Sequence, residues 1–232
     1  MQRSRLPISN KILAALPRVD LQRLFANLEA VTLTNGQVVC EAGEPIEQVY
    51  FPVDCLVSLL TIVDGTSAFA VGLVGREGMV GVASALGAGV SPVRAVVQSQ
   101  GMALRMKAAF FINAFRQQAA LNREVLLYVH ALKVQISQTA ACNRFHHIET
   151  RLARWLLMTR DRLSSDHFYV THEVLSYMLG VRRVGVTNAA QALKHRSLID
   201  YSRGAIDIID GPGLQAASCS CYEMVNGRHG KG

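Results

Sequence analysis

Residues 171–193 read THEVLSYMLGVRRVGVTNAAQAL, and this stretch decides the fold. Thr171 precedes a helical pattern, where its hydroxyl can accept a backbone N–H of the first turn. Gly180 follows that pattern directly, and a glycine readily takes the left-handed conformation that ends a helix and reverses the chain. Beyond a three-residue turn, apolar residues recur at helical spacing (Val186, Ala190 and Leu193). Two short helices joined by a glycine-containing turn are therefore predicted, which is the pattern of a helix-turn-helix.

The segment after these helices predicts a β-hairpin with a basic tip. Two strand-like runs, Leu198–Tyr201 and Ala205–Ile209, flank Ser202-Arg203-Gly204. A helix-turn-helix followed by such a hairpin is a winged helix. Five arginines and lysines lie between Arg182 and Arg203 against one acidic residue, and the chain carries a formal net charge of +7. This excess favours double-stranded DNA as a partner. The alternative is a structural helical hairpin with a solvated basic face.

Glycine and proline divide the rest of the chain. Ten of the eighteen glycines lie between Gly36 and Gly101, among β-branched runs and turn signals such as Asn35-Gly36 and Asp64-Gly65. These features predict an all-β sandwich or barrel. Residues 102–179 contain neither glycine nor proline, which favours long helices. The remaining expected elements are helices at 10–16, 20–28, 148–163 and 212–225 and a short strand at 168–170.

The longest expected helix runs from about Ala108 to Phe145. Its apolar residues recur at spacings of three and four over about three heptads, which indicates a helix pair and predicts a homodimer. The alternative is a helix packed on its own domain. The residues assigned to the dimer interface are Leu121, Val125, Tyr128, Leu132 and Ile136.

Several classes of protein are disfavoured by the sequence. No window approaches the ~18 apolar residues of a membrane span, and residues 1–10 lack the apolar core of an export signal. We therefore expect a cytoplasmic protein that does not bind a membrane. The five cysteines are odd in number and scattered, which argues against a disulfide framework. No catalytic constellation or zinc-hydrolase helix is found, so no catalytic or metal-binding residue is assigned and an enzyme is not expected.

Over nearly its whole length the chain resembles the Crp/Fnr regulators, the family of the cyclic-AMP receptor protein. The sequence VTLTNGQVVCEAGEPIEQVYFPVDCLVSLL at 31–60 resembles the opening strands of the family's β-roll, and GREGMVG at 75–81 resembles the entry to its ligand cassette. The resemblance implies an α+β protein that regulates transcription. Its regions would be a cyclic-nucleotide-binding-type β-roll sensor at 1–115, a dimerisation helix and hinge at 116–147, and a winged helix-turn-helix at 148–232.

The ligand cassette departs from that of the cyclic-AMP-binding members. Those members hold the ribose with a glutamate after a glycine and the cyclic phosphate with an Arg-Ser or Arg-Thr pair. Here Val82 follows Gly81, Pro92-Val93 occupies the Arg-Ser position, and Arg94 lies two residues away. A buried phosphate without a cationic partner binds poorly. The residues assigned to the effector are therefore Gly81, Val82 and Arg94. The identity of the effector is unknown, and these departures from the family pattern argue against cyclic AMP.

The predicted recognition helix also departs from the family pattern of an Arg-Glu pair with a second arginine. Arg183 matches the first arginine and suits guanine, whereas Val184 cannot accept a proton from cytosine, and Asn188 suits adenine. A different operator is therefore expected. Arg182 replaces a common serine, which removes a helix cap and adds a phosphate contact. The residues assigned to DNA are Thr171, Arg182, Arg183, Val184, Thr187, Asn188 and Arg203.

Two other functions compete with this interpretation. Cys219-Ser220-Cys221 suggests a regulator that responds to redox state or a metal, although no second Cys/His pair stands at finger spacing. Alternatively, the chain is a cyclic-nucleotide-binding module that acts on a protein partner. The basic residues between Arg182 and Arg203 favour DNA over such a partner, and an activator would also contact RNA polymerase.

Overall fold

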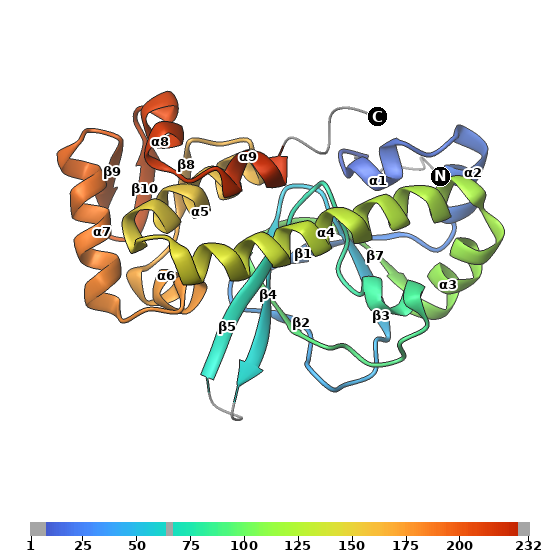
Figure 1. Ribbon diagram of the computed structural model, residues 1–232. Coiled ribbons are helices and arrows are strands. Elements are labelled where there is room, and N and C mark those ends of the chain that lie inside the picture. Colours follow the sequence, from blue (N-terminus) through green and yellow to red (C-terminus); the bar gives the residue numbers. More distant parts are fainter. Residues whose placement is uncertain (1–7, 64–66, 227–232) are drawn as a thin grey trace. The chain divides into compact units, whose positions relative to one another are not determined.

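The computed structural model describes residues 8–63 and 67–226, and the predicted Asp64-Gly65 turn lies outside them. The chain forms two compact units, shown in sequence colours in Figure 1. The first contains residues 1–59 and 74–130, and the second contains residues 60–73 and 131–232. Among the described residues, no helix is both long and apolar enough to cross a membrane.

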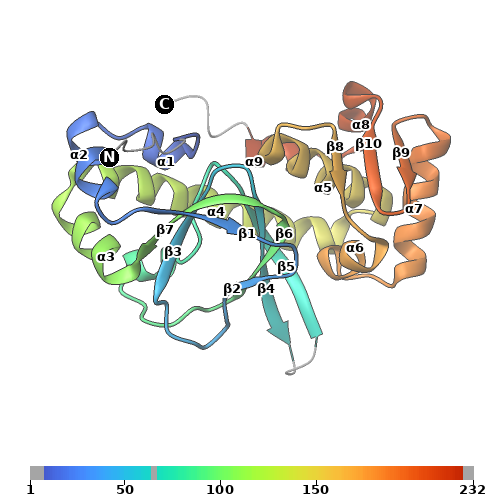
Figure 2. The same cartoon turned by 180° about the vertical axis from the view of Figure 1, so that it is seen from behind.

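The β-rich part of the chain confirms the predicted β-roll. One sheet has the order β1-β7-β3 with antiparallel pairing, and Figure 2 shows these strands side by side. Another sheet has the order β2-β6-β4-β5, in which β2 and β6 pair antiparallel. Strand β4 begins in the first unit and ends in the second, whereas β5 begins in the second and ends in the first. The strands are β1 (Glu29–Leu33), β2 (Val38–Cys40), β3 (Gln48–Pro52), β4 (Leu56–Val63), β5 (Ser67–Val74), β6 (Arg94–Ser99) and β7 (Gly101–Lys107).

Two short helices precede the strands, close to the predicted positions. They are α1 (Lys11–Ala14) and α2 (Arg18–Phe25). Asn10 caps α1 by accepting the backbone N–H of Leu13, and its buried side-chain amide donates to the carbonyls of Pro52 and Gly78. One polar side chain therefore joins three separate segments of the first unit. A 3-10 helix, η1 (Val82–Leu86), follows the cassette.

The predicted long helix is broken once. It forms α3 (Ala108–Gln117) and α4 (Ala119–Phe145), with Gln118 in an extended conformation between them. The N–H of Gln118 donates to the carbonyl of Ala114, and its own carbonyl accepts the N–H of Asn122. Gln118 therefore ends one helix and starts the next without the glycine or proline that would reveal such a break in the sequence.

The apolar stripe of α4 faces the chain's own core, which corrects the interface assigned from the sequence. Four of its five residues are buried within the chain (Leu121, Val125, Tyr128 and Leu132). The Tyr128 hydroxyl donates to the carbonyl of Met79 at 3.1 Å in the cassette. The fifth, Ile136, is 36% exposed. The stripe is buried because one face of α4 covers the β-roll, which the sequence pattern alone could not distinguish from a helix pair.

Further along α4, a glutamine side chain pairs with a strand. The Nε2 of Gln135 donates to the carbonyl of Leu73 at 3.1 Å, and the N–H of Leu73 donates to its Oε1 at 2.7 Å. Leu73 lies in β5, which is the edge strand of its sheet. Both backbone groups of this edge residue are therefore occupied.

The second unit confirms the predicted winged helix. Helix α5 follows α4 and is buried on nearly every side from Arg151 to Thr159. A three-stranded antiparallel sheet of order β8-β10-β9 supplies the wing. The elements are α5 (Ile148–Leu163), β8 (His167–Tyr169), α6 (His172–Leu179), α7 (Arg183–His195), β9 (Ile199–Ser202), β10 (Ala205–Ile208), α8 (Gly211–Ala217) and α9 (Cys221–Asn226).

The close approach of Gly78 to Tyr128 generates a prediction about stability. A Cβ atom at Gly78 would overlap the Tyr128 ring, which is buried and held by its hydrogen bond to Met79. We expect Gly78→Ala to destabilise the protein by about 1–3 kcal/mol in chemical denaturation, because the ring must leave its place. Gly89→Ala is the control, since nothing lies within 4 Å of its Cβ position. Equal effects of the two variants would contradict this packing.

Candidate nucleic-acid interface

The helix-turn-helix is formed by the local signals that its sequence contains. The Thr171 hydroxyl accepts the N–H of Val174 at 3.2 Å and so caps α6, as predicted. Gly180 ends α6 in the left-handed conformation, with φ at 60°, also as predicted. The next N–H, of Val181, donates to the carbonyl of Ser176 and tightens the reversal. These caps determine where α7 starts and which of its residues face outward.

Helix α7 has one apolar face and one polar face. Its inner face is buried, as the spacing predicts (Val186, Ala189, Ala190 and Leu193). Its outer face begins with the exposed residues Arg182, Arg183 and Val184, and Asn188 is exposed about a turn later. Arg182 is the N-cap residue and makes no side-chain capping bond, so its guanidinium extends into solvent. Positive charge and free backbone N–H groups at this helix start suit a phosphate.

The hydroxyl of Thr187 is used inside the motif. It donates to the carbonyl of Arg183 at 3.1 Å and lies 3.0 Å from Nδ1 of His172. The His172 ring stacks on Tyr201 of the wing, with 4.3 Å between the centroids. Burial, and then the charge of Arg183, lower the pKa of His172, so the ring is neutral at neutral pH. This chain of contacts joins α6, α7 and β9.

The wing ends in a two-residue turn. Ser202 pairs with Ala205, and both residues between them have positive φ, 50° at Arg203 and 86° at Gly204. Positive φ at both central positions defines the type I′ turn, whose twist matches that of a hairpin. Arg203 is exposed at this tip. The left-handed conformation of a non-glycine residue is uncommon, so the hairpin pairing and Gly204 stabilise it here.

The basic residues of the motif fall into two groups. Lys194 forms an ion pair with Asp200 at 2.6 Å, and Arg196 forms one with Glu149 at 2.8 Å. The hydrogen bond from Lys194 lowers the pKa of the Asp200 carboxyl. Within the described part of the chain, no acidic side chain pairs with any of the other three (Arg182, Arg183 and Arg203). The unneutralised charge is therefore concentrated on the start of α7 and the wing tip.

The residues assigned to the effector lie in a cassette that disfavours anions. Gly81, at φ 86°, starts η1, and Val82 is half-buried beside it. The Nε of Arg94 donates to both carboxylate oxygens of Glu41, at 2.8 and 3.0 Å. A cavity of about 340 Å³ next to this pair is lined in part by Glu41, Glu44 and Glu47. The carboxylate of Glu41 therefore neutralises Arg94, and the lining of the adjacent cavity includes three glutamates.

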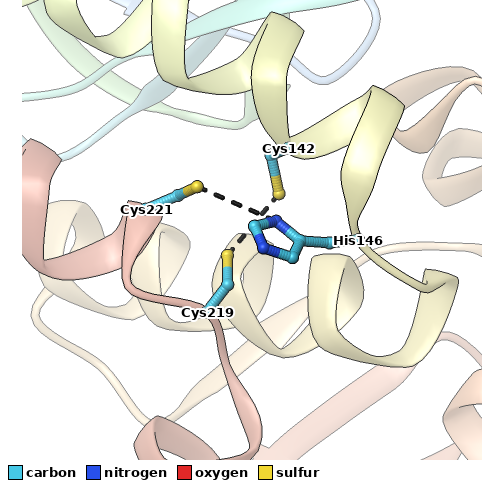
Figure 3. Close-up of side chains that lie close together, drawn as sticks. All are labelled: Cys142, His146, Cys219 and Cys221. Carbon is cyan, nitrogen blue, oxygen red and sulfur yellow. Dashed lines mark hydrogen bonds between the residues drawn. The ribbon is translucent and has the colours of Figure 1, made fainter.

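A second cluster was not assigned from the sequence. Cys219 and Cys221 lie beside Cys142 and His146, and their side chains point toward one another in Figure 3. The expected helix at 212–225 is two helices, α8 and α9, and the break between them carries Cys219. No spacing rule connects Cys142 and His146 to cysteines more than seventy residues away, so the sequence alone could not show this cluster.

Two family models match the chain. The cyclic nucleotide-binding domain matches residues 30–118, and the Crp-like helix-turn-helix domain matches residues 150–217. These two domains, in this order, cover most of the chain. The chain therefore belongs to the Crp/Fnr family of transcription regulators. A search of curated protein sequences found no match.

Solved structures share the fold. FixK2 from Bradyrhizobium japonicum is 13% identical, with a TM-score of 0.72 over 83% of this chain and 98% of that one. The CRP-family regulator TTHB099 from Thermus thermophilus is 15% identical, with a TM-score of 0.68 over 81% and 96%. The c-di-GMP-responsive regulator CLP from Xanthomonas campestris is 13% identical, with a TM-score of 0.67 over 83% and 99%. These likenesses show that the four chains share a fold.

Proposed function

We propose that the chain is a homodimeric transcription regulator that binds a specific, pseudo-palindromic site on double-stranded DNA. One observation carries the proposal: the arginines without an acidic partner, Arg182, Arg183 and Arg203, lie at the start of α7 and at the wing tip. In a winged helix these are the parts that meet the major groove and the phosphates. Such a protein would act in the cytoplasm, would not be an enzyme, and as an activator would contact RNA polymerase.

Each outward residue of α7 has a proposed role. Arg183 reads a guanine through a bidentate contact, and Asn188 reads a neighbouring adenine. The exposed Val184 cannot accept a hydrogen bond, so it offers only apolar contact, such as with a thymine methyl group. Arg182 and Arg203 contact phosphates. Thr171 and Thr187 act by holding the motif in shape, since their hydroxyls already bond within it.

The division between base and phosphate contacts is testable. Arg183→Ala should lose about 1–3 kcal/mol of discrimination at one symmetric base position. Arg203→Ala should weaken binding to all sequences alike and lower the slope of log K against log salt by about one, because it removes a phosphate contact. Binding-site selection, followed by titrations at several salt concentrations, measures both effects. Full sequence preference in Arg183→Ala would show that α7 does not read the groove.

The same titrations separate DNA binding from the rival function. A cyclic-nucleotide-binding module that acts on a protein partner would show no salt-dependent affinity for any DNA. Lys194→Ala is a matched control for charge, since Lys194 is already paired with Asp200. It should change the salt slope less than Arg203→Ala does.

Dimerisation is proposed through the outer face of α4. Because the stripe from Leu121 to Leu132 is buried in the chain, the interface must use other residues. Leu126 and Leu127 are 46% and 53% exposed on the same helix. Adjacent exposed leucines on a long helix suit a helix partner, and two copies would place two recognition helices on a symmetric site.

Paired variants distinguish the two faces of α4. Leu126→Glu with Leu127→Glu should give a folded monomer by light scattering, because the charges oppose helix pairing without entering the core. Val125→Glu with Leu132→Glu should instead unfold the protein, because both positions are buried. Circular dichroism checks the fold of each. A dimer that persists in the first variant rules out this face as the interface.

The signal sensed in the β-roll is proposed to be something other than cyclic AMP. The pairing of Arg94 with Glu41 and the three glutamates of the adjacent cavity support this, because both features oppose a phosphate. The same argument applies to c-di-GMP, to which the Xanthomonas regulator responds. An effector that binds in this cavity must then be neutral or cationic. Any other effector must bind elsewhere.

Calorimetry tests the proposal directly. Titration of the purified dimer with cyclic AMP, cyclic GMP or c-di-GMP should give no heat of specific binding at micromolar ligand. Glu41→Gln should lose the ion pair with Arg94 and make weak anion binding detectable. A micromolar dissociation constant for any of the three in the unaltered protein would overturn the assignment.

A further inference from the structure

Four side chains of the kinds that bind metal ions meet in the second unit. Cys142 lies in the last turn of α4, and His146 directly follows the end of that helix. The N–H of His146 donates to the carbonyl of Cys142 at 3.0 Å, so the two residues are one helical turn apart. Cys219 precedes α9, and Cys221 is its first residue. Their ligand atoms all lie within 4.8 Å of one another. Figure 3 shows the three sulfurs grouped around the imidazole.

The spacing matches a single tetrahedral ion. The sulfurs of Cys142 and Cys219 are 3.6 Å apart, and Sγ of Cys221 lies 3.8 Å from Nδ1 of His146. With Zn–S bonds of about 2.3 Å, two thiolates on one tetrahedral zinc are about 3.8 Å apart. An iron-sulfur cluster would need a wider arrangement, because its ligands bind different iron atoms. Three sulfurs and one imidazole also exclude calcium and magnesium, which take oxygen ligands.

The surroundings of the cluster supply a second, independent observation. Arg151 and Arg154 are both buried in α5, and the Nε of each has no hydrogen-bond partner. Within the described residues, no carboxylate pairs with either guanidinium. Both arginines line the same small cavity as Cys142, which places the guanidinium groups close to the cluster. Buried charges need a compensating partner, and here the nearest candidate is the set of thiols in their ionised form.

The alternative is that the cysteines are small apolar core residues. All three are buried, as free cysteines often are. That alternative explains their burial but leaves the two arginines without any anionic partner. It also gives no reason for the half-buried His146 to face the three sulfurs. A zinc ion with three thiolates carries one net negative charge and accounts for both features.

We propose that Cys142, His146, Cys219 and Cys221 form a mononuclear, tetrahedral Zn²⁺ site that fastens the C-terminal end of α4 to the start of α9. Each thiol that binds releases its proton to solvent, and His146 binds through the lone pair of neutral Nδ1. Because the protein fills all four positions, the site has no place for a substrate and is structural. It does not depend on the proposed DNA binding or on the identity of the effector.

Metal content of the full-length protein tests the site. The protein is purified without a metal-affinity tag, under reducing conditions, loaded with Zn²⁺ and dialysed. Elemental analysis by mass spectrometry should find one zinc ion per chain. Cys219→Ser should lose the zinc, whereas Cys40→Ser, which alters a cysteine of β2 in the first unit, should keep it. Clearly less than one zinc in the unaltered protein, or equal losses in both variants, would overturn the proposal.

Cobalt supplies a second test, which begins with the unaltered protein. Co²⁺ exchanged into the unaltered protein should show the intense visible bands of a tetrahedral ion and thiolate charge-transfer absorption for three sulfurs. In Cys221→Ser the charge-transfer intensity should fall by about a third. Weak, octahedral-type bands, or a Cys142–Cys219 disulfide found in reduced and zinc-loaded protein, would contradict the site. Removal of the zinc by a chelator should lower the melting temperature, and re-addition should restore it.

Discussion

The second unit depends on the burial of charged side chains in α5. This helix is covered on nearly every side from Arg151 to Thr159, so its arginines cannot reach water freely. Arg151 donates to the carbonyl of Leu179, the last residue of α6, and thereby holds the end of that helix where Gly180 turns the chain. Burial lowers the pKa of Arg151, because desolvation disfavours the charged form of its guanidinium. This anchor thus supports the turn that the caps at Thr171 and Gly180 define, after which α7 starts with Arg183 facing outward.

The elements that the sequence predicts well are those whose signals are local. Thr171 and Gly180 mark the ends of α6 through their own capping chemistry, and the basic wing tip follows from its two-residue turn. The stripe on α4 was interpreted wrongly because a periodic pattern gives the direction of an apolar face but not what covers it. Tyr128 meets Met79 and Gly78, some fifty residues earlier, and only the tertiary structure brings them together. The break at Gln118 carries no glycine or proline and was also missed.

The candidate sites could likewise be predicted only where their sequence signals are local. The outward arginines of α7 could be found from a short segment, because helix geometry decides which residues share a face. The neutralisation of Arg94 by Glu41 could not, since Arg94 lies in β6, Glu41 follows the end of β2, and the two residues are 53 positions apart. The cysteine cluster is the extreme case, because two of its residues lie at the end of α4 and the other two lie just before and at the start of α9. The region boundaries near residues 115 and 147 stay a prediction, because the compact units divide within α4 itself.

The pairing of Gln135 with Leu73 has a consequence for the solubility of the sheet. An edge strand exposes a row of N–H and C=O groups, and such a row is a template on which a second chain can add a strand. Gln135 imitates that second strand for one residue, since its amide accepts from and donates to the same backbone unit. At Leu73 the edge therefore offers no free donor or acceptor to an added strand. A side chain that interrupts the apolar face of α4 thus caps the sheet edge at that residue.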